Sequence, residues 1–191
     1  MILDIQIQKA VIVEVKKSVP KWTSETLRVE RITLGNLMDS KWFNDEVTIT
    51  KFKEFLKVGH IGFFCYKGDV CIFRTWIFIN SDNTFVGNNF IYQLAENEVF
   101  SGWSETALNY RGLGAFSFTL NQIIHELPNL NISAYIAHDN IASIRGTEKT
   151  GFEITKRLLL IKFYRLRCKI QFAGKNNSWV FRLGFSHKII K

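Results

Sequence analysis

The sequence predicts an α/β (α+β) fold in one domain that spans residues 1–191. Three observations predict it: several short runs are rich in alternating β-branched residues, amphipathic helical patterns lie between them, and glycine-containing turns separate the runs. A chain of 191 residues is long enough for one well-packed domain and short for two. Apolar residues make up 47% of the chain, so we expect a substantial core.

The elements follow from local patterns along the chain. Strands are expected at residues 2–17, 27–32, 61–66, 70–79, 99–108, 132–137 and 152–163, with a C-terminal hairpin that turns around 174–177. Thr33 is expected to cap a helix that runs to Phe43, and Thr50 to cap a second helix that ends at Gly59. The sequence contains no internal repeat and no interdomain linker.

Two further helices are expected in the C-terminal half. The first has one apolar face, and Pro128 ends it. Its apolar residues are Phe116, Leu120, Ile123, Ile124 and Leu127. The second helix covers residues 140–150.

The first of these helices is preceded by the segment Arg-Gly-Leu-Gly-Ala-Phe, residues 111–116. Gly112 and Gly114 can adopt positive φ without steric cost, and Arg111 adds a fixed cation. Free N–H groups at a helix N-terminus, together with the helix dipole, favour a bound anion. The segment therefore predicts a phosphate-binding loop. An ordinary turn is the alternative, because many turns contain a Gly-x-Gly.

A second segment, residues 140–152, reads Asn-Ile-Ala-Ser-Ile-Arg-Gly-Thr-Glu-Lys-Thr-Gly-Phe. Asn140 is a good N-cap, and Gly151 is placed to end the helix. Together the two segments resemble the GCN5-related N-acetyltransferase (GNAT) superfamily, whose fingerprint is Arg/Gln-x-x-Gly-x-Gly/Ala followed by an Asn-x-x-Ser/Ala helix that ends in Lys-x-Gly-Phe. The matching residues are Arg111, Gly114, Asn140, Ser143, Lys149, Gly151 and Phe152.

The resemblance implies a mixed central sheet with helices on both faces. It covers a core of about residues 27–172, so the first strand is expected to be an addition and the C-terminal hairpin a further one. It also implies acetyl-CoA as cosubstrate, with the pantetheine arm along the strand at Thr106 and Leu108. The residues expected to bind the cosubstrate are Thr106, Leu108, Arg111, Gly112, Leu113, Gly114, Ala115, Phe116, Asn140 and Ser143.

Two residues depart from the family pattern. Phe116 stands where the family usually has Gly or Ala, which alters the close approach of the backbone to the pyrophosphate. Thr147 occupies the position that often holds a tyrosine serving as general acid. A threonine hydroxyl cannot donate a proton usefully near neutral pH. The resemblance therefore supports binding of acyl-CoA more strongly than any specific catalytic chemistry.

In such transferases an amine attacks the thioester directly in a ternary complex, so a proton acceptor is needed. Glu105 and His138 are the candidates for the catalytic base; the alternatives are a surface carboxylate and a loop histidine. Aromatic side chains at Trp103, Trp76 and Phe63 are candidates for the wall of an acceptor pocket, although aromatic residues in strands more often belong to the core.

Charge is distributed unevenly. The net charge is +8, and residues 154–191 contain ten Lys/Arg and no Asp/Glu. Arg165, Arg167 and Lys169 alternate with apolar residues and are expected on one strand face, either as a solvated face or as a binding surface for an anion. Without a recognisable motif, nucleic acid is the least favoured partner. A homodimer stays open.

Composition also indicates the cellular compartment of the protein. Three cysteines without metal-ligand spacing are expected to be reduced thiols of a cytoplasmic protein, and no metal is expected. No run is long enough to span a bilayer, and Asp4 argues against a signal peptide.

Two functions follow. The first is an N-acetyltransferase that uses acetyl-CoA on a small amine, either neutral or anionic, such as an amino sugar. The second is a catalytically degenerate protein of the same fold that serves as a CoA-binding or interaction module.

Overall fold

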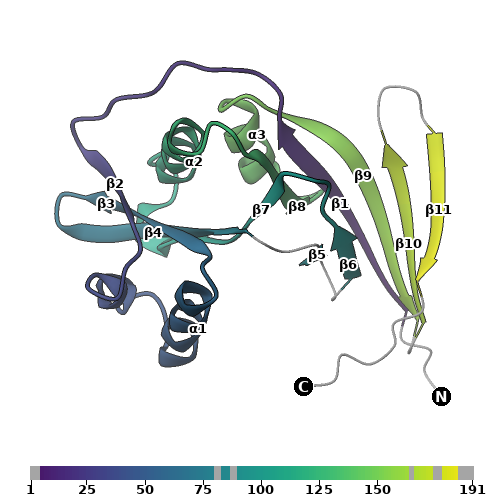
Figure 1. Ribbon diagram of the computed structural model, residues 1–191, viewed down its shortest axis with the longest axis horizontal. Helices are drawn as coiled ribbons and strands as arrows, with labels where there is room; N and C mark the ends of the chain where they lie inside the picture. The colour runs from purple at the N-terminus through teal and green to yellow at the C-terminus, as the bar shows by residue number, and fades with distance from the viewer. Residues whose placement is uncertain (1–4, 80–82, 87–89, 164–165, 174–177, 185–191) are drawn as a thin grey trace.

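The computed structural model describes the backbone of residues 5–79, 83–86, 90–163, 166–173 and 178–184, and the side chains of residues 6–79 and 94–161. Within these ranges nine strands form one sheet in the order β11-β10-β9-β1-β8-β7-β4-β3-β2, and β5 and β6 form a separate hairpin (Figure 1). Their bounds are β1 Ile5–Val15, β2 Leu27–Arg31, β3 Ile61–Lys67, β4 Val70–Phe78, β5 Asn83–Val86, β6 Phe90–Gln93, β7 Glu98–Thr106, β8 Asn131–Ala137, β9 Phe152–Phe163, β10 Leu166–Ala173 and β11 Ser178–Gly184.

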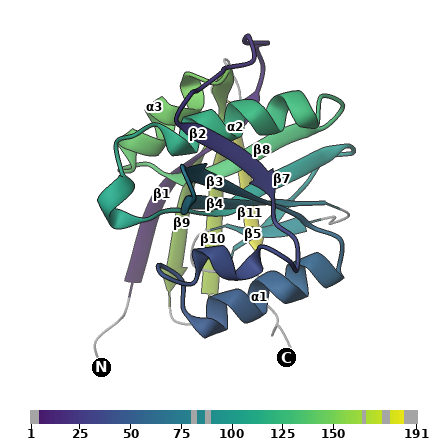
Figure 2. The ribbon, with the colours of Figure 1, turned by 90° about the vertical axis from the view of Figure 1, so that its left-hand side faces the viewer.

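Helices cover both faces of the sheet, as the family resemblance implies. The helix α1 (Glu46–Lys57) packs on one face, and α2 (Ala115–Glu126) and α3 (Ile141–Glu148) lie on the other (Figures 1 and 2). The large sheet is mixed, because β7 and β8 are parallel whereas β4 and β7 are antiparallel. The predicted α/β class and mixed architecture are confirmed.

The first strand lies inside the sheet. β1 lies inside the sheet between β8 and β9 and is antiparallel to both. Residues 10–13 of this strand are buried on both of its sides, with at most 2% of each residue exposed. The extra N-terminal strand is present as predicted, but the core does not begin at about residue 27, because β1 supplies the backbone partners that join β8 to β9.

Two predicted helix caps are also wrong. Thr33 and Asn36 close a hydrogen-bonded turn, Thr33 N donating to Asn36 Oδ1 at 2.7 Å, and only a short 3-10 helix (Leu37–Ser40) follows. α1 begins at Glu46, where Asp45 is the N-cap and accepts a hydrogen bond from Thr48 N. Thr50 lies inside this helix, and its hydroxyl donates to the carbonyl oxygen of Glu46 at 2.9 Å.

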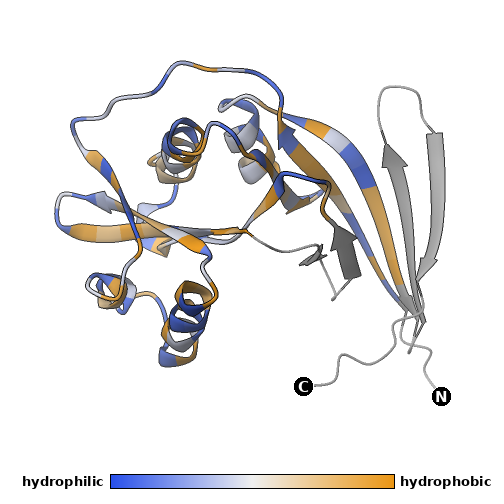
Figure 3. Cartoon of the chain, in the orientation of Figure 1, coloured by the Kyte–Doolittle hydropathy of each residue, from blue (hydrophilic) through white to orange (hydrophobic). Residues whose placement is uncertain are grey.

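The core lies on both sides of the sheet. Figure 3 shows apolar residues concentrated along β1, β3, β4 and β9. Phe63 belongs to the core beneath α2, and Trp76 belongs to the core beneath α1; both are fully buried. Neither residue can therefore line an acceptor pocket, which corrects that part of the prediction.

Candidate functional site

Two parallel strands in the middle of the sheet separate at their C-terminal ends. β7 pairs with β8 only from Glu98 to Ser101, and the last pair is Ser101 with Ala134. Beyond this point β7 continues to Thr106 beside β4, whereas β8 continues to Ala137 beside β1. The two strands thus leave unpaired backbone edges facing each other, where a ligand can add its own hydrogen bonds.

A β-bulge lies on β7 where this separation begins. Trp103 and Ser104 together oppose the single residue Thr75 of β4. The φ angle of Trp103 is +53°, a left-handed conformation that is rare for a bulky residue and that costs free energy. Bulges re-aim the side chains of a strand and often occur beside functional sites.

The glycine loop forms a left-handed entry into α2. Gly112 and Gly114 have φ angles of +84° and +79°, and Gly114 is the N-cap residue of the helix, with no side-chain cap. The first intrahelical hydrogen bond runs from Phe118 N to the carbonyl oxygen of Gly114 at 2.9 Å. The N–H groups of residues 115–117 therefore have no carbonyl partner within the helix and can bind an anion.

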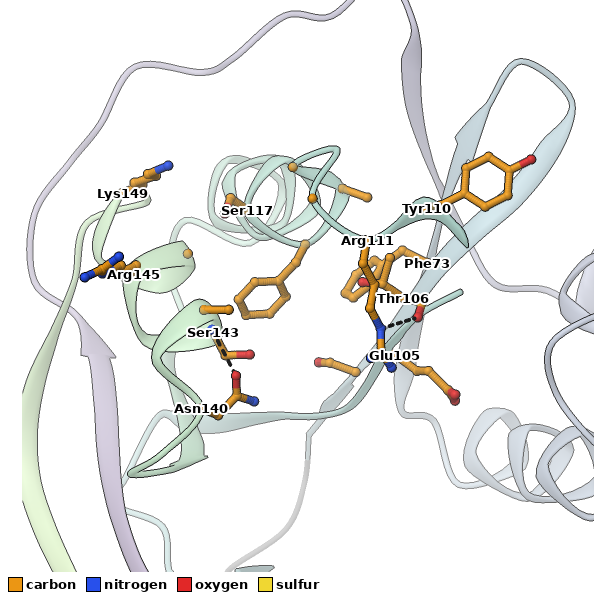
Figure 4. Close-up of a pocket in the computed structure, with 17 residues that line it drawn as sticks. Phe73, Glu105, Thr106, Tyr110, Arg111, Ser117, Asn140, Ser143, Arg145 and Lys149 are labelled. Atoms are coloured by element: carbon orange, nitrogen blue, oxygen red, sulfur yellow. Dashed lines mark hydrogen bonds between the residues drawn. The ribbon is translucent and has the colours of Figure 1, made fainter. Parts of the chain in front are cut away.

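These segments enclose a cavity of about 530 Å³ (Figure 4). Its walls come from the end of β7, the glycine loop, the start of α2 and one side of α3. The lining residues are Phe73, Ser104, Glu105, Thr106, Tyr110, Arg111, Gly112, Gly114, Ala115, Phe116, Ser117, Asn140, Ala142, Ser143, Arg145, Gly146 and Lys149.

Cationic side chains gather on the walls of the cavity. Arg111 is turned towards β7, its Nε lying 3.5 Å from the carbonyl oxygen of Thr106. On the opposite wall, Arg145 lies on α3 and Lys149 is the C-cap residue of this helix, one turn further along (Figure 4). Asn140 caps α3 by accepting a hydrogen bond from Ser143 N at 3.2 Å. Three cations near a free helix N-terminus make this cavity suited to a ligand that carries several phosphates.

The ring of Phe116 packs against Gly146 of the neighbouring helix α3. A β-carbon at Gly146 would lie 2.9 Å from Cδ1 of the Phe116 ring. The ring also contacts Phe73, with 5.9 Å between the ring centroids. A large residue at the second position of α2 is thus accommodated because α3 has no side chain opposite it.

A buried arginine connects the bulge to the layer beneath it. Arg74 donates from Nε to Asn44 Oδ1 at 2.6 Å, from one terminal nitrogen to the carbonyl oxygen of Trp103, and from the other to Glu105 Oε2 at 2.6 Å. Its side chain is 8% exposed, whereas that of Glu105 is 43% exposed. Burial lowers the pKa of Arg74, and the carboxylate of Glu105 opposes this shift. The guanidinium therefore fixes both the bulge and the acidic side chain.

Most residues predicted to bind the cosubstrate meet at the cavity, and three predicted residues do not line it. Thr106, Arg111, Gly112, Gly114, Ala115, Phe116, Asn140 and Ser143 line it together with Glu105. Leu108 and Leu113 are exposed outside the lining. His138 is exposed just after β8, and its backbone N–H donates to the carbonyl oxygen of Lys9.

Sequence reasoning missed several lining residues, among them Ser104, Tyr110 and Arg145. The pattern around Asn140 contained a usable signal for Arg145, because Lys149 lies four residues further along the same helix and faces the same way. Nothing local in the sequence identifies Phe73, which reaches the cavity from β4 through long-range pairing.

Other reactive side chains lie away from the cavity. Thr147 is fully buried, and its hydroxyl donates to the carbonyl oxygen of Ile144 at 2.8 Å. Cys65 and Cys71 are free and buried, and burial raises the pKa of these thiols to about 11 and about 12. Neither cysteine is a competent nucleophile near neutral pH. The side chain of Cys168 lies outside the described residues.

The basic C-terminal segment is described only as backbone. Arg167 and Lys169 lie two residues apart in β10, where they pair with Lys162 and Leu160 of β9. Arg165 lies outside the described residues. In the part of the chain whose side chains are described, no group of His, Cys, Asp or Glu is arranged to hold a metal ion. None of the described helices has the length and apolar character to cross a bilayer.

Comparisons with known proteins connect this architecture to one fold. No family model matches the chain, and no curated protein matches it in sequence. Solved structures do match. A GNAT-family protein from Novosphingobium aromaticivorans is 10% identical over 82% of this chain, with a TM-score of 0.58. A GNAT-family acetyltransferase from Colwellia psychrerythraea is 8% identical over 84%, with a TM-score of 0.57.

A third match is the GCN5-related glucosamine N-acetyltransferase region of a fungal multi-domain β-N-acetylglucosaminidase, 11% identical over 83% of this chain, with a TM-score of 0.57. This chain spans 65%, 56% and 21% of the length of these three proteins. At such low identity the likeness concerns the fold, and the fold is that of the GCN5-related N-acetyltransferases.

Proposed function

We propose that this chain, which has the fold of the GCN5-related N-acetyltransferases, transfers an acetyl group from acetyl-CoA to a primary amine. One observation carries the proposal: the cavity joins a free helix N-terminus and three cations to the unpaired edge of β7. Such a site fits a long ligand with phosphates at one end and amide groups along its arm.

Different lining residues would bind different parts of acetyl-CoA. The N–H groups of residues 115–117 and the side chain of Arg111 would hold the pyrophosphate, because they are the donors nearest to the left-handed loop. Arg145 and Lys149 would hold phosphate on the opposite wall. The exposed backbone of β7 around Thr106 would pair with the pantetheine amides. Acetyl-CoA supplies an activated acetyl thioester.

Glu105 is our candidate for the group that takes the proton from the amine. It lines the cavity, and its Oε2 accepts a hydrogen bond from Arg74, which holds the carboxylate in one orientation. Its other oxygen, Oε1, has no hydrogen-bond partner among the described residues and is available to an ammonium group. His138 is the weaker candidate, since it does not line the cavity.

The acceptor is proposed to be a small amine, with amino sugars as the first to test. One structure of the same fold is named for glucosamine N-acetylation, and the ten cations in residues 154–191 favour an acceptor that also carries a phosphate or carboxylate. Neutralising Arg167 and Lys169 should then raise the acceptor KM and weaken its dependence on salt, while the affinity for acetyl-CoA stays the same.

Release of free thiol from acetyl-CoA tests the function. The purified chain is incubated with acetyl-CoA and a panel of amino sugars, amino acids, polyamines and peptides. Amine-dependent thiol release, lost in Glu105→Gln and retained in Glu54→Gln, would support the assignment; Glu54 is a surface residue paired with Lys51 on α1. Binding of CoA without turnover on any amine would favour the second function, a binding module that keeps the fold and lacks the reaction.

A further inference from the structure

The exposed face of Trp103 is the feature of this molecule that the proposed function does not yet explain. Of the three aromatic residues considered for an acceptor pocket, Trp76 and Phe63 are fully buried, but Trp103 is 46% exposed. It directly precedes Ser104 and Glu105, which line the cavity. A large apolar side chain is therefore presented to solvent next to the proposed site of chemistry.

The backbone conformation of Trp103 is unfavourable, and contacts with surrounding residues hold it in place. Its φ of +53° belongs to the region where glycine is preferred, yet a tryptophan stands there. Arg74, itself buried, donates a hydrogen bond to the carbonyl oxygen of Trp103 and so holds the bulge. Trp103 does not itself line the cavity, but it directly precedes two residues that do, and strain held beside a cavity by a buried network points to a function for the strained residue.

Aromatic packing fixes the ring from below. Phe55, at the C-terminal end of α1, meets Trp103 edge to face, with 5.1 Å between the ring centroids. Phe55 in turn packs against Trp76 and Phe78, each with centroids 5.1 Å away. The indole thus packs on a cluster of aromatic rings that restricts its motion. Because it is already ordered, it loses little side-chain entropy when a ligand contacts it.

We propose that Trp103 is the residue that selects the acceptor, by stacking on a primary amine carried on a six-membered ring. The inference rests on the proposed function and names its substrate class. Tryptophan offers a broad flat face to the C–H groups of a sugar ring or to an aromatic ring. Arg74 connects the ring to Glu105, because its guanidinium carbon lies 5.9 Å from the centroid of the indole and one of its nitrogens donates to Glu105 Oε2. An amine stacked on the indole would therefore lie near this carboxylate.

Acceptor kinetics at saturating acetyl-CoA test the proposal. Glucosamine and 2-phenylethylamine represent the two kinds of ring, and putrescine and n-hexylamine serve as acyclic amines. The wild type should prefer one of the ring amines, and which one it prefers distinguishes a sugar from an aromatic acceptor. Trp103→Leu should lower kcat/KM for that amine roughly tenfold and leave the acyclic amines within about twofold.

Two controls separate stacking from folding. Trp103→Phe keeps an aromatic face and the same backbone strain, so it should retain most of the preference. Leu34 is another exposed apolar residue, 73% exposed and absent from the cavity lining, so Leu34→Ala should leave the preference unchanged. An unchanged preference in Trp103→Leu, or an equal loss for ring and acyclic amines, would overturn the proposal.

Failure of the proposed function gives a different result. If no amine supports thiol release, binding of glucosamine and 2-phenylethylamine to the CoA-loaded protein is measured by ligand-observed NMR. Binding that is lost in Trp103→Leu and kept in Trp103→Phe would still assign the ring subsite. Absence of binding to the wild type, or binding that is indifferent to Trp103, would refute it.

Discussion

A methyl group added at Gly146 tests how the two helices that frame the cavity fit together. The new carbon would lie 2.9 and 3.1 Å from two carbons of the Phe116 ring and 3.1 Å from Ser117 Oγ. Ordinary contacts between carbon atoms are about 3.5–4.0 Å. The ring must therefore shift, or the helices must separate, in the variant Gly146→Ala.

The magnitude follows from two opposing effects. Overpacking of this kind costs about 1–3 kcal/mol, while alanine in place of glycine inside a helix gains about 0.5–1 kcal/mol. Gly146→Ala should consequently lower the free energy of unfolding by between about 0 and 2.5 kcal/mol. Phe116 lines the cavity, so a displaced ring should also weaken CoA binding.

Removal of the ring should reverse the sign. In a Phe116→Ala background nothing obstructs the methyl group except Ser117, and Gly146→Ala should then stabilise the protein by about 0.5 kcal/mol or more. Urea unfolding of the four proteins gives the coupling free energy, which we expect to be about 1–3 kcal/mol, the overpacking cost that disappears with the ring. Equal effects of Gly146→Ala in the two backgrounds would refute the proposed packing of Phe116 on Gly146.

Two further predictions concern side chains outside the cavity. Thr147→Ala should lower the free energy of unfolding by about 1 kcal/mol, through loss of its hydrogen bond to Ile144, and leave turnover within a few-fold; a hundredfold drop in kcat would instead identify it as a general acid. Burial disfavours the charge of Glu14, but hydrogen bonds from two lysines and Thr155 prevail and lower its pKa to about 2 from the usual 4.5. The stability that Glu14 contributes is thus present above about pH 4.5 and is lost as the pH falls through 2. Glu14→Gln should cost on the order of 2 kcal/mol at pH 7 and little near pH 2, and a difference from the wild type that does not change with pH would contradict this.

Local patterns predicted the elements of the fold well. The strand at 152–163 and the helix after the glycine loop have the positions that alternation and amphipathic spacing indicate. Caps were harder to predict, because Thr50 is a plausible cap by type while Asp45, five residues earlier, actually begins the helix. Polar residues of several types compete for such positions, and tertiary packing decides between them.

Strand pairing was the main feature that could not be read from local sequence. Alternation identifies β1 as a strand but does not say which strands lie beside it. The run Ala-Val-Ile-Val at residues 10–13 contained a usable signal, because an uninterrupted apolar run is typical of a strand that is buried on both faces. The two motifs at 111–116 and 140–152 located most of the cavity, since each carries its own backbone geometry.

The bulge at Trp103 had one weak signal in the sequence, Gly102 inside the predicted strand at 99–108, and nothing that identified Trp103 itself. A left-handed backbone conformation is usually predicted from a glycine in the sequence. Here a tryptophan adopts this conformation, because contacts with Arg74 and Phe55 hold Trp103 in place. Both contacts come from distant parts of the chain. The exposure of Trp103 and the pairing of Glu105 with Arg74 therefore became visible only in three dimensions.

Calorimetric titration of CoA into three proteins tests the central claim most directly. Gly114 and Gly68 both have positive φ and open space around the position of a β-carbon, but only Gly114 lies in the cavity; Gly68 lies in the turn between β3 and β4. Valine at either position has a similar backbone cost, about 1–2 kcal/mol. The wild type and Gly68→Val should bind one CoA per chain with similar affinity, whereas Gly114→Val should lose binding. No binding by the wild type, or equal affinity in all three proteins, would contradict the account.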